Sequence, residues 1–151
     1  MNEIKVAENK TLKLTNVLSR VVRPEELGNL SVILTQMQNF IKSNNAQPIG
    51  PLVQGIRMGT GPDHVPEMYM MQQATQMISK MEPGYHMDAV LRVKNCLYAH
   101  YTGPLSKSQL ASAKLQIMAF ENDIKLTDSS YTIYVNQDDD EAVIDVFMET
   151  K

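Results

Sequence analysis

An internal repeat is the feature of this sequence that most restricts how the chain can fold. Residues 80 positions apart match along much of the chain: Pro24 with Pro104, Leu30 with Leu110, Met37 with Ile117, Phe40 with Phe120, and Val53 with Ile133. Near the end of each half the offset shortens to 78, where Glu67-Met68-Tyr69-Met70 matches Asp145-Val146-Phe147-Met148. These matches predict a duplicated structural unit, with pseudo-repeats over roughly 12–72 and 89–150.

Each half contains one segment with helical periodicity. Over 24–44, apolar residues recur at three- and four-residue spacings: Leu27, Leu30, Leu34, Met37 and Ile41. Over 106–124 the same spacing joins Leu110, Ala113, Ile117, Phe120 and Ile124. Both stripes predict amphipathic helices that lie on a sheet. Ser106, followed three residues later by Gln109, is the predicted N-cap of the second helix.

The other periodic segments are rich in β-branched and aromatic residues and predict strands. They cover 17–22, 52–58, 64–72, 89–102, 131–136 and 142–149, with short edge strands at 4–6 and 12–14. A turn is predicted at 59–63, while 73–84 is either a short strand or a loop. Asp138-Asp139-Asp140-Glu141 is the predicted solvated tip of the last hairpin.

This order of elements predicts an α+β fold built from two strand–helix–strand–strand units. Two such units can pair their edges into one curved antiparallel sheet, with both helices on one face and a ligand groove on the other. A length of 151 residues suits one compact domain over 1–151.

Composition narrows the classes of partner. The net charge is −3 and the chain has no lysine- or arginine-rich stripe, which argues against direct binding of nucleic acid. No apolar run approaches the ~18 residues that span a bilayer, so no membrane partner is expected. The segment 1–9 lacks the apolar core of a secretory signal, which predicts a cytoplasmic protein.

No metal or other cofactor is expected. Cys96 is the single cysteine, and His64, His86 and His100 lack the spacing of a zinc site. The chain has eleven methionines, whose thioethers could bind copper, but adaptable packing in the core and pocket is the favoured interpretation.

The C-terminal half resembles the gyrase-inhibitor-like (GyrI-like) effector-binding domains. The likeness is carried by three segments: Tyr98-Ala99-His100-Tyr101-Thr102-Gly103-Pro104-Leu105 before the second helix, Tyr131-Thr132-Ile133-Tyr134-Val135, and Val143-Ile144-Asp145-Val146-Phe147-Met148. The first half matches mainly in the order of its elements. This family includes effector domains of multidrug-sensing transcription activators as well as stand-alone proteins of about this length.

The resemblance implies an aromatic groove that binds hydrophobic, often cationic molecules around a buried glutamate. Thr132 occupies the position at which many members carry that glutamate, and the chain has no tryptophan. A preference for cations would therefore depend on Glu67 or Asp145.

Strand alternation predicts which side chains face the groove. The predicted ligand-binding residues are Glu67, Tyr69, Tyr98, Thr132, Tyr134, Asp145 and Phe147, with His100 on the same face. The predicted helix-facing residues are Met68, Met70, Leu91, Val93, Leu97, Ala99, Tyr101, Tyr131, Ile133, Val135, Ile144, Val146 and Met148. Glu67 is the favoured acid, either as a cation ligand or as a general base.

Three functions are consistent with these features. The leading hypothesis is a stand-alone binding protein that senses or sequesters a small hydrophobic molecule, cationic or neutral. The alternatives are a small-molecule hydrolase that uses Glu67, and a gyrase-interacting inhibitor, to which only the acidic tip points. A role in transcription regulation would require a partner regulator, because 151 residues leave no room for a DNA-binding domain beside this one.

Overall fold

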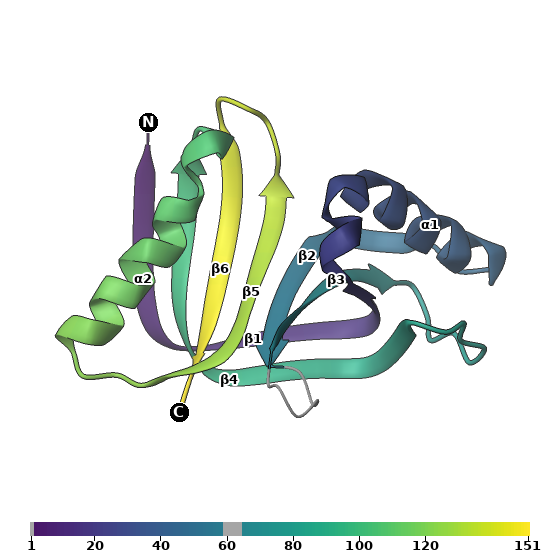
Figure 1. Ribbon diagram of the computed structural model, residues 1–151, viewed down its shortest axis with the longest axis horizontal. Coiled ribbons are helices and arrows are strands. Elements are labelled where there is room, and N and C mark those ends of the chain that lie inside the picture. Colours follow the sequence, from purple (N-terminus) through teal and green to yellow (C-terminus); the bar gives the residue numbers. More distant parts are fainter. Residues whose placement is uncertain (1, 59–64) are drawn as a thin grey trace. The chain divides into compact units, whose positions relative to one another are not determined.

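The computed structural model describes residues 2–58 and 65–151 (Figure 1). The strands are β1 (Glu3–Val22), β2 (Pro48–Met58), β3 (Pro66–Ala74), β4 (Tyr85–Gly103), β5 (Leu126–Asn136) and β6 (Ala142–Thr150). The helices are the 3-10 helix η1 (Pro24–Asn29), α1 (Leu30–Ser43), the 3-10 helix η2 (Leu105–Lys107) and α2 (Gln109–Glu121). None of the helices in the described ranges has the length and apolar character needed to cross a membrane.

The chain divides into two compact units with the same topology. The first-repeat unit is Lys13–Arg92, and the second-repeat unit is Met1–Leu12 together with Val93–Lys151. In the first, β3 pairs antiparallel with both β1 and β2; in the second, β6 pairs antiparallel with both β4 and β5. The α+β class and the duplicated strand–helix–strand–strand order are therefore confirmed.

Each unit also includes part of a long strand from the other half of the sequence. In the second-repeat unit, Ile4 of β1 packs against the core, and its carbonyl accepts a hydrogen bond from Lys114 Nζ at 3.2 Å. In the first-repeat unit, Tyr85 of β4 packs edge-on against Phe40 of α1, with ring centroids 4.9 Å apart. The edge strands predicted at 4–6 and 12–14 are thus parts of one strand, β1.

The first-repeat core follows the predicted stripe over most of its length. Met37 and Ile41 are fully buried, and Leu30 and Leu34 pack against the same cluster. Leu27 is wrong as a core residue, because 51% of it is exposed. The first six residues of the predicted helix form η1 instead, and none of them is buried.

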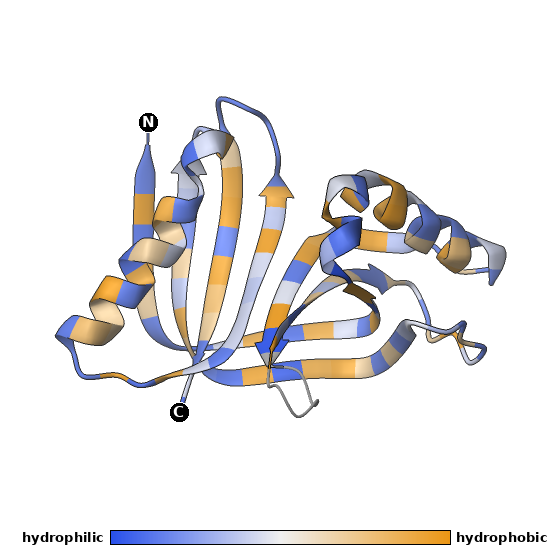
Figure 2. Ribbon diagram, in the orientation of Figure 1, coloured by the Kyte–Doolittle hydropathy of each residue, from blue (hydrophilic) through white to orange (hydrophobic). Residues whose placement is uncertain are grey.

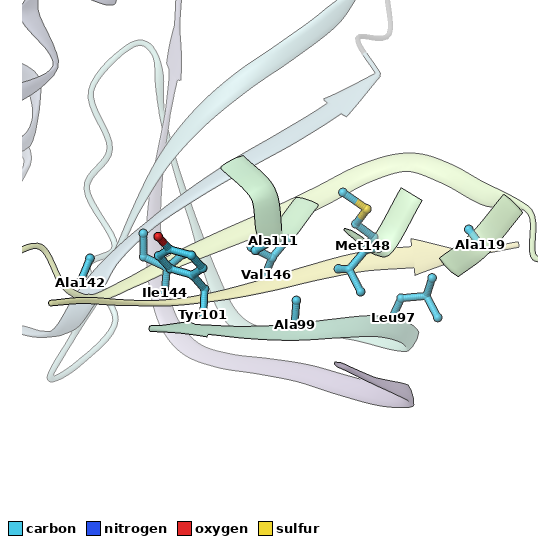
Figure 3. Close-up of a cluster of buried hydrophobic side chains, with 10 residues drawn as sticks. Leu97, Ala99, Tyr101, Ala111, Ala119, Ala142, Ile144, Val146 and Met148 are labelled. Atoms are coloured by element: carbon cyan, nitrogen blue, oxygen red, sulfur yellow. The ribbon is translucent and has the colours of Figure 1, made fainter. Parts of the chain in front are cut away.

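The second-repeat core contradicts the predicted stripe on α2. The helix buries Ala111, Leu115 and Ala119. Figure 3 shows Ala111 and Ala119 in this cluster. The opposing sheet residues are Leu97, Ala99, Tyr101, Ile144, Val146 and Met148, as predicted. Leu110, Ile117 and Phe120 are instead 49%, 59% and 84% exposed. Hydrophobic residues occur around the helix (Figure 2), so periodicity alone selected the wrong face.

The structural repeat in the helices therefore has an offset of 78, not the 80 inferred from the sequence. Ile33, Met37 and Ile41 on α1 correspond to Ala111, Leu115 and Ala119 on α2, 78 positions later. Asn45 and Asp123, which follow the two helices in left-handed conformations with φ of 63° and 54°, keep the same offset. The pairing of Val53 with Ile133 is also wrong, because Val53 lies opposite Met71 whereas Ile133 lies opposite Asp145.

Several local predictions also have clear outcomes. Ser106 is not the N-cap of α2: that position is Ser108, whose side chain makes no capping hydrogen bond. The ambiguous segment 73–84 completes β3 at Ala74 and then leaves regular structure. The acidic tip is exposed and connects β5 to β6. The predicted turn at 59–63 and His64 lie outside the described residues.

Candidate functional site

Each repeat unit carries an acid and an aromatic residue on the sheet face turned away from its own helix. In β6, Ile144, Val146 and Met148 pack toward α2, so the alternating residues Asp145 and Phe147 point to the other face. Residues directly opposite one another in an antiparallel pair share a face. Tyr98 lies opposite Phe147, and His100 lies opposite Asp145. These four residues are named the Asp145 cluster.

Two hydrogen-bonding groups converge on one oxygen of Asp145. Tyr98 Oη donates to Oδ1 at 2.8 Å, and His100 Nδ1 lies 2.6 Å from the same atom. The side chains of His100 and Asp145 are 35% and 21% exposed. The carboxylate is therefore held in place by two contacts and remains partly exposed.

Tyr98 and Phe147 form an aromatic wall beside this carboxylate. Their ring centroids are 5.0 Å apart, at an interplanar angle of 46°. Burial raises the pKa of Tyr98 to about 12, and both the hydrogen bond to Asp145 and its negative charge add to the effect. Tyr98 therefore stays protonated at neutral pH and acts as a donor that orients the acid, not as a base.

The first-repeat unit has a corresponding Glu67 cluster, made of Arg57, Glu67 and Tyr69. Tyr69 Oη donates to Glu67 Oε2 at 2.7 Å. The Cζ atom of Arg57 lies over the Tyr69 ring, 4.3 Å from its centroid. Arg57 is also the residue opposite Glu67 across the β2–β3 pair. The acid favoured from the sequence thus shares its face with a cation of the protein itself.

Comparisons with known proteins identify the fold. No family model and no curated protein matches the chain. Solved structures do: the EcmrR C-terminal domain aligns over 100% of this chain and 98% of its own, with 14% identity and a TM-score of 0.64. SAV2435 bound to tetraphenylphosphonium aligns over 99% and 94%, with 12% identity and a TM-score of 0.56. These alignments show that the chain has the GyrI-like fold.

Two further solved structures are similar to this chain. EcmrR in a complex with DNA has a TM-score of 0.70 and 15% identity, and this chain spans 57% of its length. A hydrolase from Listeria innocua aligns over 99% of this chain and 92% of its own, with 7% identity and a TM-score of 0.59. At these identities the likeness establishes the fold alone.

Five of the predicted ligand-binding residues lie on the predicted face. They are Glu67, Tyr69, Tyr98, Asp145 and Phe147, and they fall into the two clusters. Strand alternation places them correctly because the alternate, helix-facing residues of β3, β4 and β6 are uniformly apolar. Whether they bind a ligand stays a prediction.

Thr132 and Tyr134 point the other way, so their predicted orientation is wrong. They lie opposite Val146 and Ile144, which face α2. Tyr134 packs against that core, and burial raises its pKa. The error arose because both faces of β5 carry apolar residues, so alternation did not fix the phase. Tyr131 and Ile133, predicted to face the helix, share the face of Phe147 and Asp145 instead.

Arg57 and His100 are the functional candidates that the sequence reasoning did not assign. Strand alternation places His100 on the open face and assigns it no role, and its contact with Asp145 requires the β4–β6 register. Arg57 could be recognised as a candidate only from the β2–β3 register, which places it opposite Glu67.

The hollows found within the second-repeat unit are not lined by any residue of the Asp145 cluster. One, of about 470 Å³, is lined by Glu8, Asn9, Asn95, Leu97, Asp123, Ile124, Lys125, Thr150 and Lys151. Another, of about 450 Å³, is lined by Asn2, Thr102, Gly103, Asn136, Asp140, Glu141 and Val143. Neither contains a predicted ligand-binding residue, and the ligand groove stays a prediction. No group of three or more metal-binding side chains occurs among residues 2–58 and 65–151.

Proposed function

We propose that this chain binds a small hydrophobic cation at the Asp145 cluster. The observation that carries this proposal is a partly exposed carboxylate beside the Tyr98–Phe147 aromatic pair, on the sheet face that α2 does not cover. An aromatic face attracts a cation by about 0.5–2 kcal/mol. The acid adds charge attraction, and the rings add apolar contact area.

The two polar neighbours of Asp145 suit this role. Tyr98 and His100 both contact Oδ1, so they restrict the rotation of the carboxylate before a ligand arrives. A preorganised site loses less conformational entropy on binding. Tyr98 also belongs to the aromatic pair, so one residue contributes both to the wall and to the orientation of the acid.

The structural comparisons support the same class of ligand. SAV2435 was solved bound to tetraphenylphosphonium, a cation with four aromatic rings. EcmrR was solved in a complex with DNA, as a chain longer than this one. By analogy of fold, we extend binding of a lipophilic cation to this chain, and its use in sensing or sequestration follows as part of the proposal.

Calorimetric titration with tetraphenylphosphonium tests the proposal. Asp145→Asn should raise the dissociation constant about tenfold, equivalent to about 1.4 kcal/mol, because it removes one charge and keeps the shape. Asp138→Asn, the same change in the exposed hairpin tip, is the matched control and should alter binding less than about twofold, because bulk solvent and salt screen that charge.

The neutral ligand triphenylphosphine oxide separates charge from hydrophobic contact. Its affinity should be unchanged by Asp145→Asn and reduced by Phe147→Ala. Equal loss of both ligands in the Asp145 variant would show that the substitution damages the site in general. Absence of saturable tetraphenylphosphonium binding to the unaltered chain would reject the proposal.

A second candidate function is hydrolysis of a small molecule. The observation that favours it is the 2.6 Å contact between His100 Nδ1 and Asp145, an arrangement in which an acid orients an imidazole as general base. The Listeria hydrolase of the same fold is consistent with it. His100→Gln should then abolish turnover of activated esters, while Glu67→Gln, the replacement of the acid first favoured, should not. Turnover that depends on Glu67 and not on His100 would assign the chemistry to the other cluster.

A further inference from the structure

Arg57 is placed unusually for a charged side chain. Its guanidinium carbon lies 4.3 Å from the centroid of the Tyr69 ring, within the range of a cation–π contact. Its Nε atom is buried and has no hydrogen-bond partner among residues 2–58 and 65–151. A buried polar donor without a partner destabilises the folded state. The position must therefore be compensated by something other than a hydrogen bond to Nε.

The surroundings of Arg57 supply that compensation. Tyr69 presents its ring face, and Glu67 lies directly opposite Arg57 on the neighbouring strand. Tyr69 Oη donates to Glu67 Oε2, so the phenol and the carboxylate are held together. An aromatic face fixed beside a carboxylate is the same combination of groups that the proposed function assigns to a ligand cation at Asp145.

Equivalent positions in the two units show what differs. Glu67 corresponds to Asp145 and Tyr69 to Phe147, both at an offset of 78. The residue opposite the acid is Arg57 on β2 in the first-repeat unit and Ile133 on β5 in the second. The first-repeat cluster thus includes an arginine at the position where the second-repeat cluster has an aliphatic residue.

We propose that Arg57 is a built-in occupant of a second cation site formed by Glu67 and Tyr69. Its guanidinium takes the place of a ligand, so that a cationic ligand binds at the Asp145 cluster alone. The latent site suits a small planar or quaternary cation of the guanidinium or methylammonium class. This inference rests on the proposed function for its premise that an acid–aromatic pair selects cations.

Replacing Arg57 by alanine should expose the latent site. Methylguanidinium, which reproduces the missing head group, should then bind with a dissociation constant in the millimolar range and shift the ring proton resonances of Tyr69. Methylurea has the same shape without the charge and should bind at least tenfold more weakly. Adding Glu67→Gln to Arg57→Ala should abolish the preference for the cation. The unaltered chain and Arg57→Lys should show no such shift at Tyr69.

A second readout covers loss of stability in the Arg57→Ala variant. If the variant is marginally folded, methylguanidinium should raise its melting temperature and methylurea should not, because a ligand that binds the folded state stabilises it. Equal effects of the two ligands, or no effect of either, would overturn the inference. A negative result with methylguanidinium would leave the Asp145-dependent binding of tetraphenylphosphonium unaffected. Conversely, absence of tetraphenylphosphonium binding would not change the result expected with methylguanidinium.

Discussion

The two repeat units share one topology but fill equivalent positions with side chains of different size. Where α1 buries Ile33, Met37 and Ile41, α2 buries Ala111, Leu115 and Ala119. The sheet beneath α2 contributes Leu97, Tyr101, Ile144, Val146 and Met148 to the same cluster. The strand–helix–strand–strand order is thus shared by two cores of different composition, as expected where the pattern of apolar positions is kept.

The sheet faces turned away from the helices also carry different side chains in the two units. The Asp145 cluster combines its acid with a neutral tyrosine donor and a histidine, whereas the Glu67 cluster already contains Arg57. Duplication therefore supplied two similar acid–aromatic pairs with different neighbours. Arg57 lies opposite the acid of one unit and Ile133 opposite the acid of the other, and Tyr98 has the aliphatic counterpart Val21. This contrast can be tested in the cores first and then at the sites.

The largest expected effect concerns the buried face of α2. Leu115→Ala should lower the free energy of unfolding by about 2–5 kcal/mol, because Leu115 is fully buried and the substitution leaves a cavity. Phe120→Ala removes a larger side chain that is 84% exposed, so its cost should stay within about 0.5 kcal/mol. Urea denaturation measures both. A larger cost for Phe120 than for Leu115 would reinstate the stripe inferred from the 80-residue offset.

A smaller difference in stability is expected between substitutions at equivalent positions of the two helices, 119 in α2 and 41 in α1. Ala119→Leu inserts bulk where α2 lies against the sheet and should cost about 1–3 kcal/mol. Ile41→Leu, at the corresponding position of α1, conserves volume and should cost less than about 1.5 kcal/mol. Thermal unfolding of the two variants compares them directly. Tolerance of leucine at 119 would show that small residues are not required for the approach of α2.

The sequence predicts the order of elements, the duplication and the facing of β3, β4 and β6, because in those strands the apolar residues mark one face clearly. It fails where both faces of an element carry apolar residues. In α2, Leu110 and Leu115 both belong to regular apolar spacings, and only the packed sheet selects Leu115. In β5, Tyr131 and Tyr134 are similarly ambiguous, and the register with β6 decides between them.

The candidate site is predicted only in part for a related reason. Alternation along single strands places Asp145 and Phe147 on the open face, but contacts between strands need their register. The convergence of Tyr98 and His100 on Asp145 depends on the β4–β6 register. The position of Arg57 depends on the β2–β3 register, which no residue pattern in the sequence fixes.

At the sites, charge removal should affect the two acids unequally. Asp145→Asn should weaken tetraphenylphosphonium binding about tenfold, or about 1.4 kcal/mol. Glu67→Gln should weaken it less than about twofold, because Arg57 already neighbours that acid and long-range attraction is screened by salt. Parallel calorimetric titrations of the two variants provide the test. Equal losses of affinity would show that both acids contribute equally to binding. Arg57 would then not distinguish the Glu67 cluster from the Asp145 cluster.

The smallest expected effect is spectroscopic and concerns Tyr98, which lies opposite Phe147. In the first-repeat unit the equivalent residue, opposite Tyr69, is the aliphatic Val21. Phenolate absorbance of the native chain minus that of Tyr98→Phe should titrate with a pKa of about 12, above the ordinary 10.0. Asp145→Asn should lower this pKa and leave it above 10.0, because burial is the largest cause and the acid adds to it.

The same shift gives a dependence of stability on pH whose sign can be checked. The folded-state pKa of Tyr98, about 12, exceeds the ordinary 10.0 of an unfolded chain, so between these values the unfolded state releases the proton first. The free energy of unfolding of the native chain, relative to Tyr98→Phe, should therefore be constant below pH 10.0 and fall as the pH rises toward 12. A difference that rises over this interval would mean that the phenolate is the form favoured in the fold. Tyr98 would then not be the donor that orients Asp145, and the contrast between the two clusters would have to rest on Arg57 alone.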